Sequence, residues 1–246
     1  MKILLLDLEL APNLATVWSI WKVNIATNQL LETSRVLCWA AKWHKHDDIM
    51  FDSEHTSDYK DMIRRLHGIM SEADAIVTYN GDGFDLKVAN REFLKLGLHP
   101  PSPAKSIDLL KTMKKKFFFV SNKLDHVSDE LDLGRKVQHE GHELWLKCMN
   151  GNDEAWQKME EYNKHDVILL ERLYDRIRGW VLNHPSLARH SGENCCVKCG
   201  SMRLQRRGRQ TTKVSVFQRW QCQDCGAWMR TRYNEEPNKE IMVEVK

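Results

Sequence analysis

Two acidic residues stand two positions apart at the end of an apolar segment near the N-terminus. Ile3 to Leu6 is a run of four aliphatic residues, typical of a strand buried on both faces, and Asp7 and Glu9 follow it. At this spacing both carboxylates point to one side of a strand. Buried like charges raise each other's pKa, and a divalent cation such as Mg²⁺ or Mn²⁺ would offset them. The alternative is a strand that surfaces at Asp7, with Glu9 solvated.

Acidic and phenolic side chains recur at two later places that could contribute to one site. Asp85 follows a predicted buried strand and a glycine-rich turn, at the start of a predicted helix. In that position it would also favour the helix dipole, which is a purely structural role. Tyr162 and Asp166 lie four positions apart in a late helical stretch, so they share one face of the helix.

The order of the predicted strands and helices that position these residues indicates an α/β fold with a mixed sheet flanked by helices. Strands come first, strands and helices then alternate, and helices follow. The segments 16–23 and 35–43 are rich in β-branched and aromatic residues, which predicts two antiparallel neighbouring strands. The other predicted strands are 2–9 and 75–79, and the predicted helices are 59–70, 84–96, 123–131 and 153–182, the last either continuous or broken near Asn163.

Three motifs, in order along the chain, resemble those of a known superfamily. Asp-x-Glu on the first strand, Asn-Gly-x-x-Phe-Asp at 80–85 and Tyr-x-x-x-Asp on the late helix are similar to the three exonuclease motifs of DEDD (DnaQ-like) 3′–5′ exonucleases. The tyrosine variant (DEDDy), shared with family B polymerase proofreading domains, fits best, because the histidine variant would need His where Glu161 stands. The segment 121–136 also looks like the linking region of stand-alone members. The resemblance covers about residues 1–182 and implies a ribonuclease H-like fold.

The resemblance implies that four carboxylates hold two catalytic Mg²⁺ or Mn²⁺ ions. Asp7 would bridge the ions, Glu9 and Asp166 would complete the site on the side of the nucleophile, and Asp85 would hold the other ion. Two such ions would activate a water and stabilise both the phosphoryl and the leaving oxygens of a phosphodiester. Tyr162, with an unperturbed pKa near 10, would orient the attacking water rather than act as a base.

Four of the seven cysteines form two Cys-x-x-Cys pairs, each followed by glycine. Cys196 and Cys199 form the first pair, Cys222 and Cys225 the second, and 22 residues separate the pairs. Four thiolates in this pattern provide a closed tetrahedral site for one structural Zn²⁺, with Cys195 as an alternative to Cys196. The segment between the pairs has room for a hairpin, which predicts a zinc ribbon. Its core would be so small that the metal supplies much of its folding free energy.

The charge of the chain is unevenly distributed. Residues 187–234 carry ten Lys and Arg against two acids, a net charge of +8, whereas residues 1–186 carry −3. Basic groups interleaved with aromatic rings suit phosphate contact and base stacking, so the ribbon is a candidate nucleic-acid-binding surface. The alternatives are a solvated surface or a docking site for a protein partner. The candidate contacts are Arg206, Arg207, Arg209 and Trp220.

The resemblance implies a metal-dependent 3′–5′ exonuclease, for which single-stranded DNA is favoured over RNA. Leu10 would wedge against the terminal base of the substrate, and Asn80 and Phe84 would line the same pocket. One alternative is a structure-specific endonuclease on the same fold, since transposon-type nucleases also combine acidic triads with zinc ribbons. The other is a nucleic-acid-binding module without turnover, against which the complete acidic set argues.

The length of the chain allows one or two domains, and the composition together with the cysteine pattern predicts a cytoplasmic protein. The 246 residues are 42% hydrophobic and 29% charged, as in soluble globular proteins, and no apolar run approaches the roughly 18 residues that span a bilayer. The pairing of cysteines fits a metal site in a reducing compartment better than disulfides. The predicted organisation is an exonuclease-like domain at 1–183, a linker at 184–194, a zinc ribbon at 195–234 and an acidic tail at 235–246.

Overall fold

The computed structural model describes residues 1–237 and 242. The chain divides into two compact units, one formed by residues 2–173 and the other by residues 174–246 together with Met1. Within the described residues, no helix has both the length and the apolar character needed to cross a membrane.

The first unit is built on a five-stranded mixed sheet with the strand order β5-β4-β1-β6-β7. Central strand β1 pairs antiparallel with β4 and parallel with β6, which confirms the predicted mixed α/β fold. β5 and β7 are short edge strands that the sequence analysis did not predict. The strands are β1 (Ile3–Leu10), β4 (Val36–Trp43), β5 (Ile49–Ser53), β6 (Ala75–Thr78) and β7 (Lys105–Asp108).

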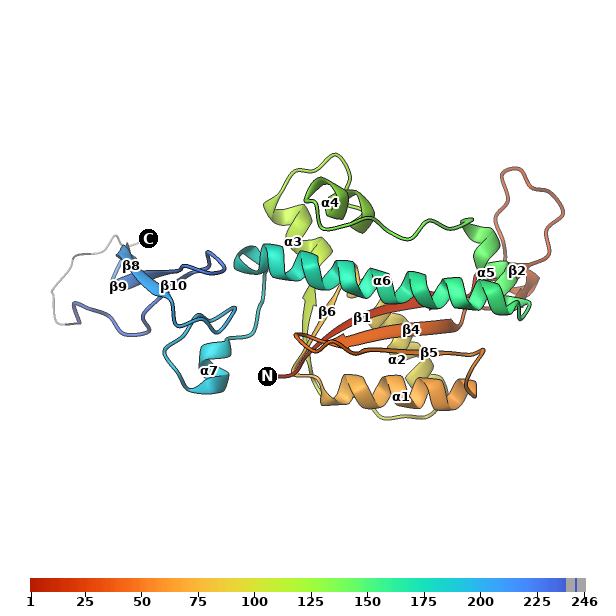
Figure 1. Cartoon of the computed structure of the whole chain (residues 1–246), viewed down its shortest axis with the longest axis horizontal. Coiled ribbons are helices and arrows are strands. Elements are labelled where there is room, and N and C mark those ends of the chain that lie inside the picture. Colours follow the sequence, from red (N-terminus) through yellow and green to blue (C-terminus); the bar gives the residue numbers. More distant parts are fainter. Residues whose placement is uncertain (238–241, 243–246) are drawn as a thin grey trace. The chain divides into compact units, whose positions relative to one another are not determined.

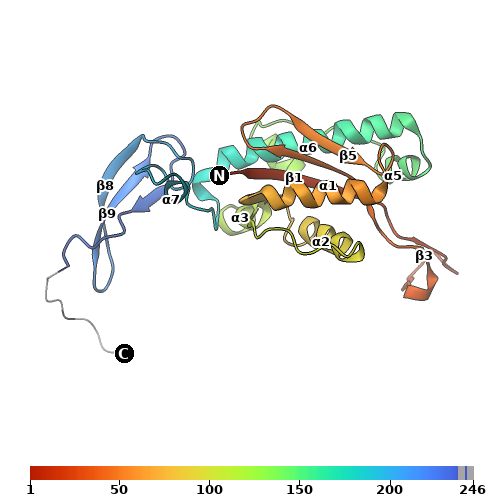
Figure 2. The ribbon, with the colours of Figure 1, turned by 90° about the horizontal axis from the view of Figure 1, so that it is seen from below.

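Helices cover both faces of this sheet. Helices α1 and α2 lie on one face, and the long helix α6 crosses the other (Figure 1; Figure 2 gives the view from below). Helix α6 runs without a break past Asn163, so the continuous alternative is confirmed. The helices are α1 (Tyr59–Glu72), α2 (Asp85–Lys95), α3 (Leu109–Lys116), α4 (Leu124–Glu130), α5 (His142–Met149), α6 (Asp153–Ile177) and α7 (Leu187–Ser191), with the 3-10 turns η1 (Thr27–Gln29) and η2 (Arg178–Trp180).

The alternation of side chains along β1 explains why its acidic residues face α6. Leu4, Leu6 and Leu8 belong to the core formed with α1 and α2. Because neighbouring residues of a strand point to opposite faces, Asp7 and Glu9 lie on the side of α6. The apolar residues of the strand thus anchor one face while its end presents carboxylates on the other.

The prediction of a strand at 16–23 is wrong. This segment is an irregular loop between β2 (Leu14–Ala15) and β3 (Leu30–Glu32), which form a separate two-stranded ribbon. The side chains of Trp18 and Trp21 are 101% and 80% exposed. Aromatic and β-branched residues predicted a strand, but among the described residues no strand lies beside this segment to supply the pairing and the cover that a strand needs.

The second unit contains a three-stranded antiparallel sheet with the order β10-β9-β8. Its strands are β8 (Leu204–Thr211), β9 (Val216–Cys222) and β10 (Trp228–Arg230), and β8 and β9 form the hairpin predicted between the cysteine pairs. Helix α7 lies inside the stretch predicted as a linker, and the predicted acidic tail falls largely outside the described residues. The predicted domain boundaries stay a prediction.

Gly81, in the turn that joins β6 to α2, offers a test of this packing. A Cβ atom at Gly81 would lie 2.2 Å from Oγ1 of Thr78, a fully buried side chain at the end of β6. Since such overpacking costs roughly 1–3 kcal/mol, Gly81→Ala should lower the free energy of unfolding in urea by that amount. The matched control is Gly68→Ala in α1, where no atom lies within 4 Å and stability should be unchanged or slightly higher. Equal stability of the two variants would contradict this packing.

Candidate active site

Three acidic side chains meet where the end of β1 faces α6. Asp7 and Glu9 come from β1 and Asp166 from α6, and one carboxylate oxygen of each lies within 4.8 Å of the others. Asp166 is buried, and its Oδ1 has no hydrogen-bond partner among the described residues. The structure therefore brings together three of the four carboxylates identified in the sequence.

The electrostatics of this cluster disfavour its ionised form. Burial, followed by repulsion from Glu9 and Asp166, raises the pKa of Asp7 well above its ordinary value. Burial and the Asp166 charge raise the pKa of Glu9 to about 8, and burial also raises the pKa of Asp166. Three carboxylates this close lack positive charge, which a divalent cation with oxygen ligands would supply. The unpartnered Oδ1 of Asp166 fits such a ligand role.

Lys136 is the positive charge closest to this cluster, and the sequence analysis missed it. Its ammonium group pairs with Asp166 and donates a hydrogen bond to the Tyr162 hydroxyl at 3.1 Å. Burial alone would lower the pKa of Lys136, but the negative charge of Asp166 and the hydrogen bonds to Asp166 and Tyr162 raise it, so the ammonium stays charged. The only sequence signal was its position at the end of the segment 121–136.

Two neutral donors hold the acidic pair of β1. The side-chain amide of Asn163, fully buried on α6, donates to Oδ2 of Asp7 at 2.7 Å. The side chain of Trp145, on α5, hydrogen-bonds to Glu9 and favours its ionised form. Sequence reasoning missed both, because their partners lie more than a hundred residues away and no local pattern marks them.

Tyr162 lies beside the cluster within a group of aromatic rings. Its ring centroid is 4.7 Å from that of His139 and 6.0 Å from that of Trp145, with both pairs edge-on. Burial and the neighbouring Asp166 raise the pKa of Tyr162 above its ordinary value. The phenol therefore stays protonated at neutral pH and can donate a hydrogen bond into the site.

Asp85 lies next to β1 but outside the group of three. It is buried at the start of α2, and its Oδ1 accepts a hydrogen bond from the backbone N–H of Leu8 at 3.2 Å. Burial raises the pKa of Asp85 to about 6. Asn80 and Phe84 lie in the preceding turn, where the N–H of Phe84 donates to the carbonyl of Asn80, and the Phe84 side chain is exposed. Leu10 packs, partly buried, against the core on the side of α1 and α2.

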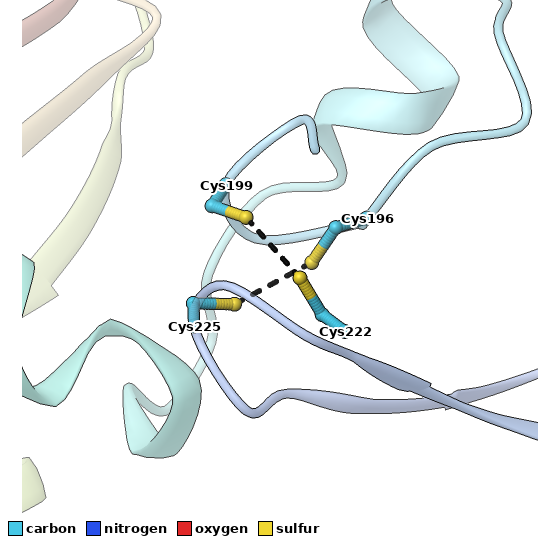
Figure 3. Close-up of side chains that lie close together, drawn as sticks. All are labelled: Cys196, Cys199, Cys222 and Cys225. Atoms are coloured by element: carbon cyan, nitrogen blue, oxygen red, sulfur yellow. Dashed lines mark hydrogen bonds between the residues drawn. The ribbon is translucent and has the colours of Figure 1, made fainter. Parts of the chain in front are cut away.

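The second unit gathers four cysteines (Figure 3). The Sγ atoms of Cys196 and Cys225 are 3.6 Å apart, as are those of Cys199 and Cys222, and all four lie within 4.8 Å. Four sulfurs about 2.3 Å from a tetrahedral zinc ion would be just under 4 Å apart, so the cluster fits this metal. Cys195 is buried outside the cluster, with its Sγ 3.8 Å from the Ser191 hydroxyl.

The two cysteine turns are built alike. The N–H of Gly200 donates to the carbonyl of Cys196, and the N–H of Gly226 donates to that of Cys222. Both glycines have φ near +70°, which a residue with a side chain rarely adopts. Backbone N–H groups lower the pKa of the Cys222 thiol to about 7 against the opposing effect of burial, and so prepare it for metal binding.

A mixed sheet whose central strand ends in clustered carboxylates defines a ribonuclease H-like protein. Residues 36–178 match the family model of the RNase_H superfamily, and the chain belongs to this superfamily. The matched range contains Asp85, Tyr162 and Asp166 and begins after β1. Membership supports a nuclease activity, and nucleases of this kind typically use divalent metals.

One similar solved structure is the family B DNA polymerase from the hyperthermophilic archaeon Pyrobaculum calidifontis. It is 17% identical, with a TM-score of 0.54, over 72% of this chain and 24% of the polymerase. At this identity the likeness shows the fold alone, and the chain spans about a quarter of the polymerase's length. No curated protein matches the sequence.

The raised pKa of Glu9 predicts how the stability of the metal-free protein depends on pH. The folded state binds the Glu9 proton more tightly than the unfolded state, with a pKa of about 8 against 4.5. The resulting stabilisation is present below pH 4.5 and is lost as the pH rises through 8. Glu9→Gln should therefore become more stable than the parent as the pH rises from 5 to 8, by up to a few kcal/mol at about 1.4 kcal/mol per pKa unit.

Urea unfolding in buffer free of Mg²⁺ and Mn²⁺ measures this difference across the pH series. Asp47→Asn, which also neutralises one carboxylate but lies in an exposed bend, is the matched control and should show no such trend. If the free energies of unfolding of the parent and of Glu9→Gln differ by the same amount at every pH, the cluster of carboxylates does not lack positive charge.

Proposed function

We propose that this protein is a metal-dependent 3′–5′ exonuclease of the tyrosine-type DEDD group. The observation that carries the proposal is the meeting of Asp7, Glu9 and Asp166 beside the buried Tyr162. Superfamily membership supports the nuclease class, and the ordered motifs in the sequence support the exonuclease type. Asp85, held next to β1 by the N–H of Leu8, is proposed as the fourth carboxylate.

The carboxylates would hold two Mg²⁺ or Mn²⁺ ions, which would neutralise charge on the phosphodiester and acidify a bound water. Asp7 is proposed to contact both ions, and Asn163 fixes its rotamer through the 2.7 Å hydrogen bond to Oδ2. Tyr162 keeps its proton, so its role is to orient the water by hydrogen bonding rather than to remove a proton. Lys136 adds a permanent positive charge beside an anionic substrate.

Nucleic acid is the proposed substrate, with single-stranded DNA favoured over RNA. Asn80 and Phe84 are proposed to contact the terminal nucleotide because they lie in the turn that leads into Asp85 and the Phe84 ring is exposed. Leu10 is proposed for the same pocket on the motif resemblance, although much of its side chain packs against the core. The second unit, with its net charge of +8 over residues 187–234, is proposed to assist substrate binding.

A single Zn²⁺ ion bound by the four clustered cysteines is proposed to stabilise the second unit as a zinc ribbon. The core around this cluster consists, besides the four cysteines, only of Leu204, Ala227 and Met229 among the described residues. Burial of so little apolar surface cannot offset the conformational entropy that the chain loses on folding. Metal ligation is therefore proposed to supply the remaining folding free energy.

The nuclease proposal predicts a particular pattern of products. In Mg²⁺ or Mn²⁺, a single-stranded oligonucleotide labelled at its 5′ end should shorten progressively, and the same strand labelled at its 3′ end should release labelled mononucleotide at once. Asp7→Ala should lose most turnover while remaining folded, because it removes the proposed bridging ligand. Tyr162→Phe should lose about 10- to 1000-fold, because only a water-orienting hydroxyl is removed.

The controls separate this proposal from its alternatives. Internal cuts in both labelled strands would favour a structure-specific endonuclease, and binding without cleavage would favour a module without turnover. Asp47→Asn, in an exposed bend, should cleave at the parent rate. A Tyr162→Phe variant as inactive as Asp7→Ala would show that the phenol does more than position water.

The zinc proposal predicts which cysteine is a ligand. Metal analysis of the purified chain should find one zinc ion per molecule. Cys196→Ser should lose the metal and unfold the second unit, observed as lost dispersion of its indole signals in NMR. Cys195→Ser is the matched control and should keep the zinc, because its sulfur lies outside the cluster. Loss of zinc from Cys195→Ser and not from Cys196→Ser would reverse the assignment.

A further inference from the structure

The sheet of the second unit has two different faces. Side chains alternate along β9, so Cys222, Trp220 and Gln218 lie on one face and Gln221, Arg219 and Phe217 on the other. The face of Cys222 carries the small core, since Leu204 of β8 stands opposite Cys222. The other face belongs to none of the apolar clusters of the described residues.

Two arginines and two aromatic rings occupy this second face. Arg230 of β10 stands directly opposite Arg219, and Trp228 stands opposite Gln221. The Arg219 guanidinium lies over the ring of Trp228 at 4.9 Å from its centroid, and that of Arg230 lies over Phe217 at 3.6 Å. These four residues are named here the Arg-aromatic face: Phe217, Arg219, Trp228 and Arg230.

The Arg-aromatic face is exposed, and the described part of the chain places no compensating negative charge on it. Both arginines are exposed, and the Trp228 side chain is 51% exposed. No carboxylate of the described residues pairs with either arginine, although Nε of Arg219 donates to the Arg207 carbonyl at 3.0 Å. Like charges directly opposite each other on a sheet are unfavourable. Stacking on the aromatic rings holds the two arginines in place and leaves their guanidinium N–H groups available for an anion.

The face of Cys222 is less suited to an anionic ligand. Arg209 lies on it, in register with Gln218, and pairs with Glu235 at 3.2 Å. Arg206 stands opposite Trp220, with its guanidinium 5.7 Å from the ring centroid. Arg206, Arg209 and Trp220, three of the contacts proposed from the sequence, therefore share a face with the zinc cluster.

We propose that the Arg-aromatic face binds single-stranded nucleic acid. The guanidinium groups of Arg219 and Arg230 contact phosphates, and bases stack on the exposed ring of Trp228 and at the edge of Phe217. A single strand fits better than a duplex, because only unpaired bases offer their faces to aromatic rings. The inference rests on the proposed nuclease function, for which it assigns the binding surface and the strand state of the substrate.

The test compares binding by full-length chains that cannot cleave. In an Asp7→Ala background, Arg219→Gln/Arg230→Gln removes two charges with little change in size. Fluorescence anisotropy with a labelled 12-nucleotide single strand, in Ca²⁺ and over a salt series, measures affinity. Because each phosphate contact on a single strand contributes roughly 0.7 to the slope of log affinity against log salt, the slope should fall by about 1.4. Trp228→Leu should weaken single-strand binding about 5- to 100-fold with the slope unchanged.

Arg189→Gln/Arg232→Gln is the matched control, because it removes the same charge from exposed positions outside the three strands of this sheet. Its slope of log affinity against log salt should stay within about 0.5 of the parent's. Zinc content and thermal unfolding check that every variant is folded. Equal slopes for the two double variants, or an unchanged slope in Arg219→Gln/Arg230→Gln, would overturn the proposal. An equal loss of duplex and single-strand affinity in Trp228→Leu would overturn the preference for single strands.

The outcome is distinguishable from failure of the nuclease proposal. If the chain with Asp7 intact cleaves no substrate while the Arg-aromatic face binds single strands as expected, the proposed function fails and the binding surface stands. If the chain cleaves from the 3′ end and Arg219→Gln/Arg230→Gln binds and cleaves as the parent does at every salt concentration, the proposed function stands and this inference fails.

Discussion

The clustering of three carboxylates where β1 faces α6, one of them buried and two partly buried, is the constraint on which the first unit depends. Their mutual repulsion opposes folding, and it is only partly offset by the ammonium of Lys136 and by the amide of Asn163. Each compensating group comes from a different part of the chain, so the cluster can form only when α6 and the segment after α4 have packed against the sheet. This shortage of positive charge after folding supports the proposal that the site binds metal ions.

The sheet solves the problem of holding such a cluster in place. β1 is flanked by β4 and β6, and its residues Leu4, Leu6 and Leu8 are buried against α1 and α2. The opposite side of the same strand is therefore rigid without needing apolar residues at its end. The carboxylates on that side are held in place by packing to which they do not contribute. The strand is therefore stable although its carboxylates repel one another.

Much of this arrangement follows from local sequence, and the rest depends on long-range contacts. The apolar run before Asp7 and the helical spacing around Asp166 predicted β1 and α6, and the motif resemblance implied that their carboxylates meet. β5 and β7 escaped prediction because short edge strands with polar residues have no clear period. Lys136 and Asn163 carry no local signal, since a lysine in a loop and an asparagine in a helix acquire a role only through partners distant in sequence. The failure at 16–23 has the opposite cause: its local signal is strong, but the part of the chain that the structure describes offers it no neighbouring strand.

The second unit has a much smaller apolar core than the first. With the thiolates holding zinc as proposed, cohesion comes from metal ligation at one end of the sheet and requires few apolar contacts. The strands are then free to carry residues that a small apolar-core domain could not accommodate, including Arg219 and Arg230 directly opposite each other. Such a pair costs stability unless its charge is offset, and the proposed nucleic-acid ligand would offset it. The proposed zinc site would thus stabilise the sheet on which the Arg-aromatic face is built.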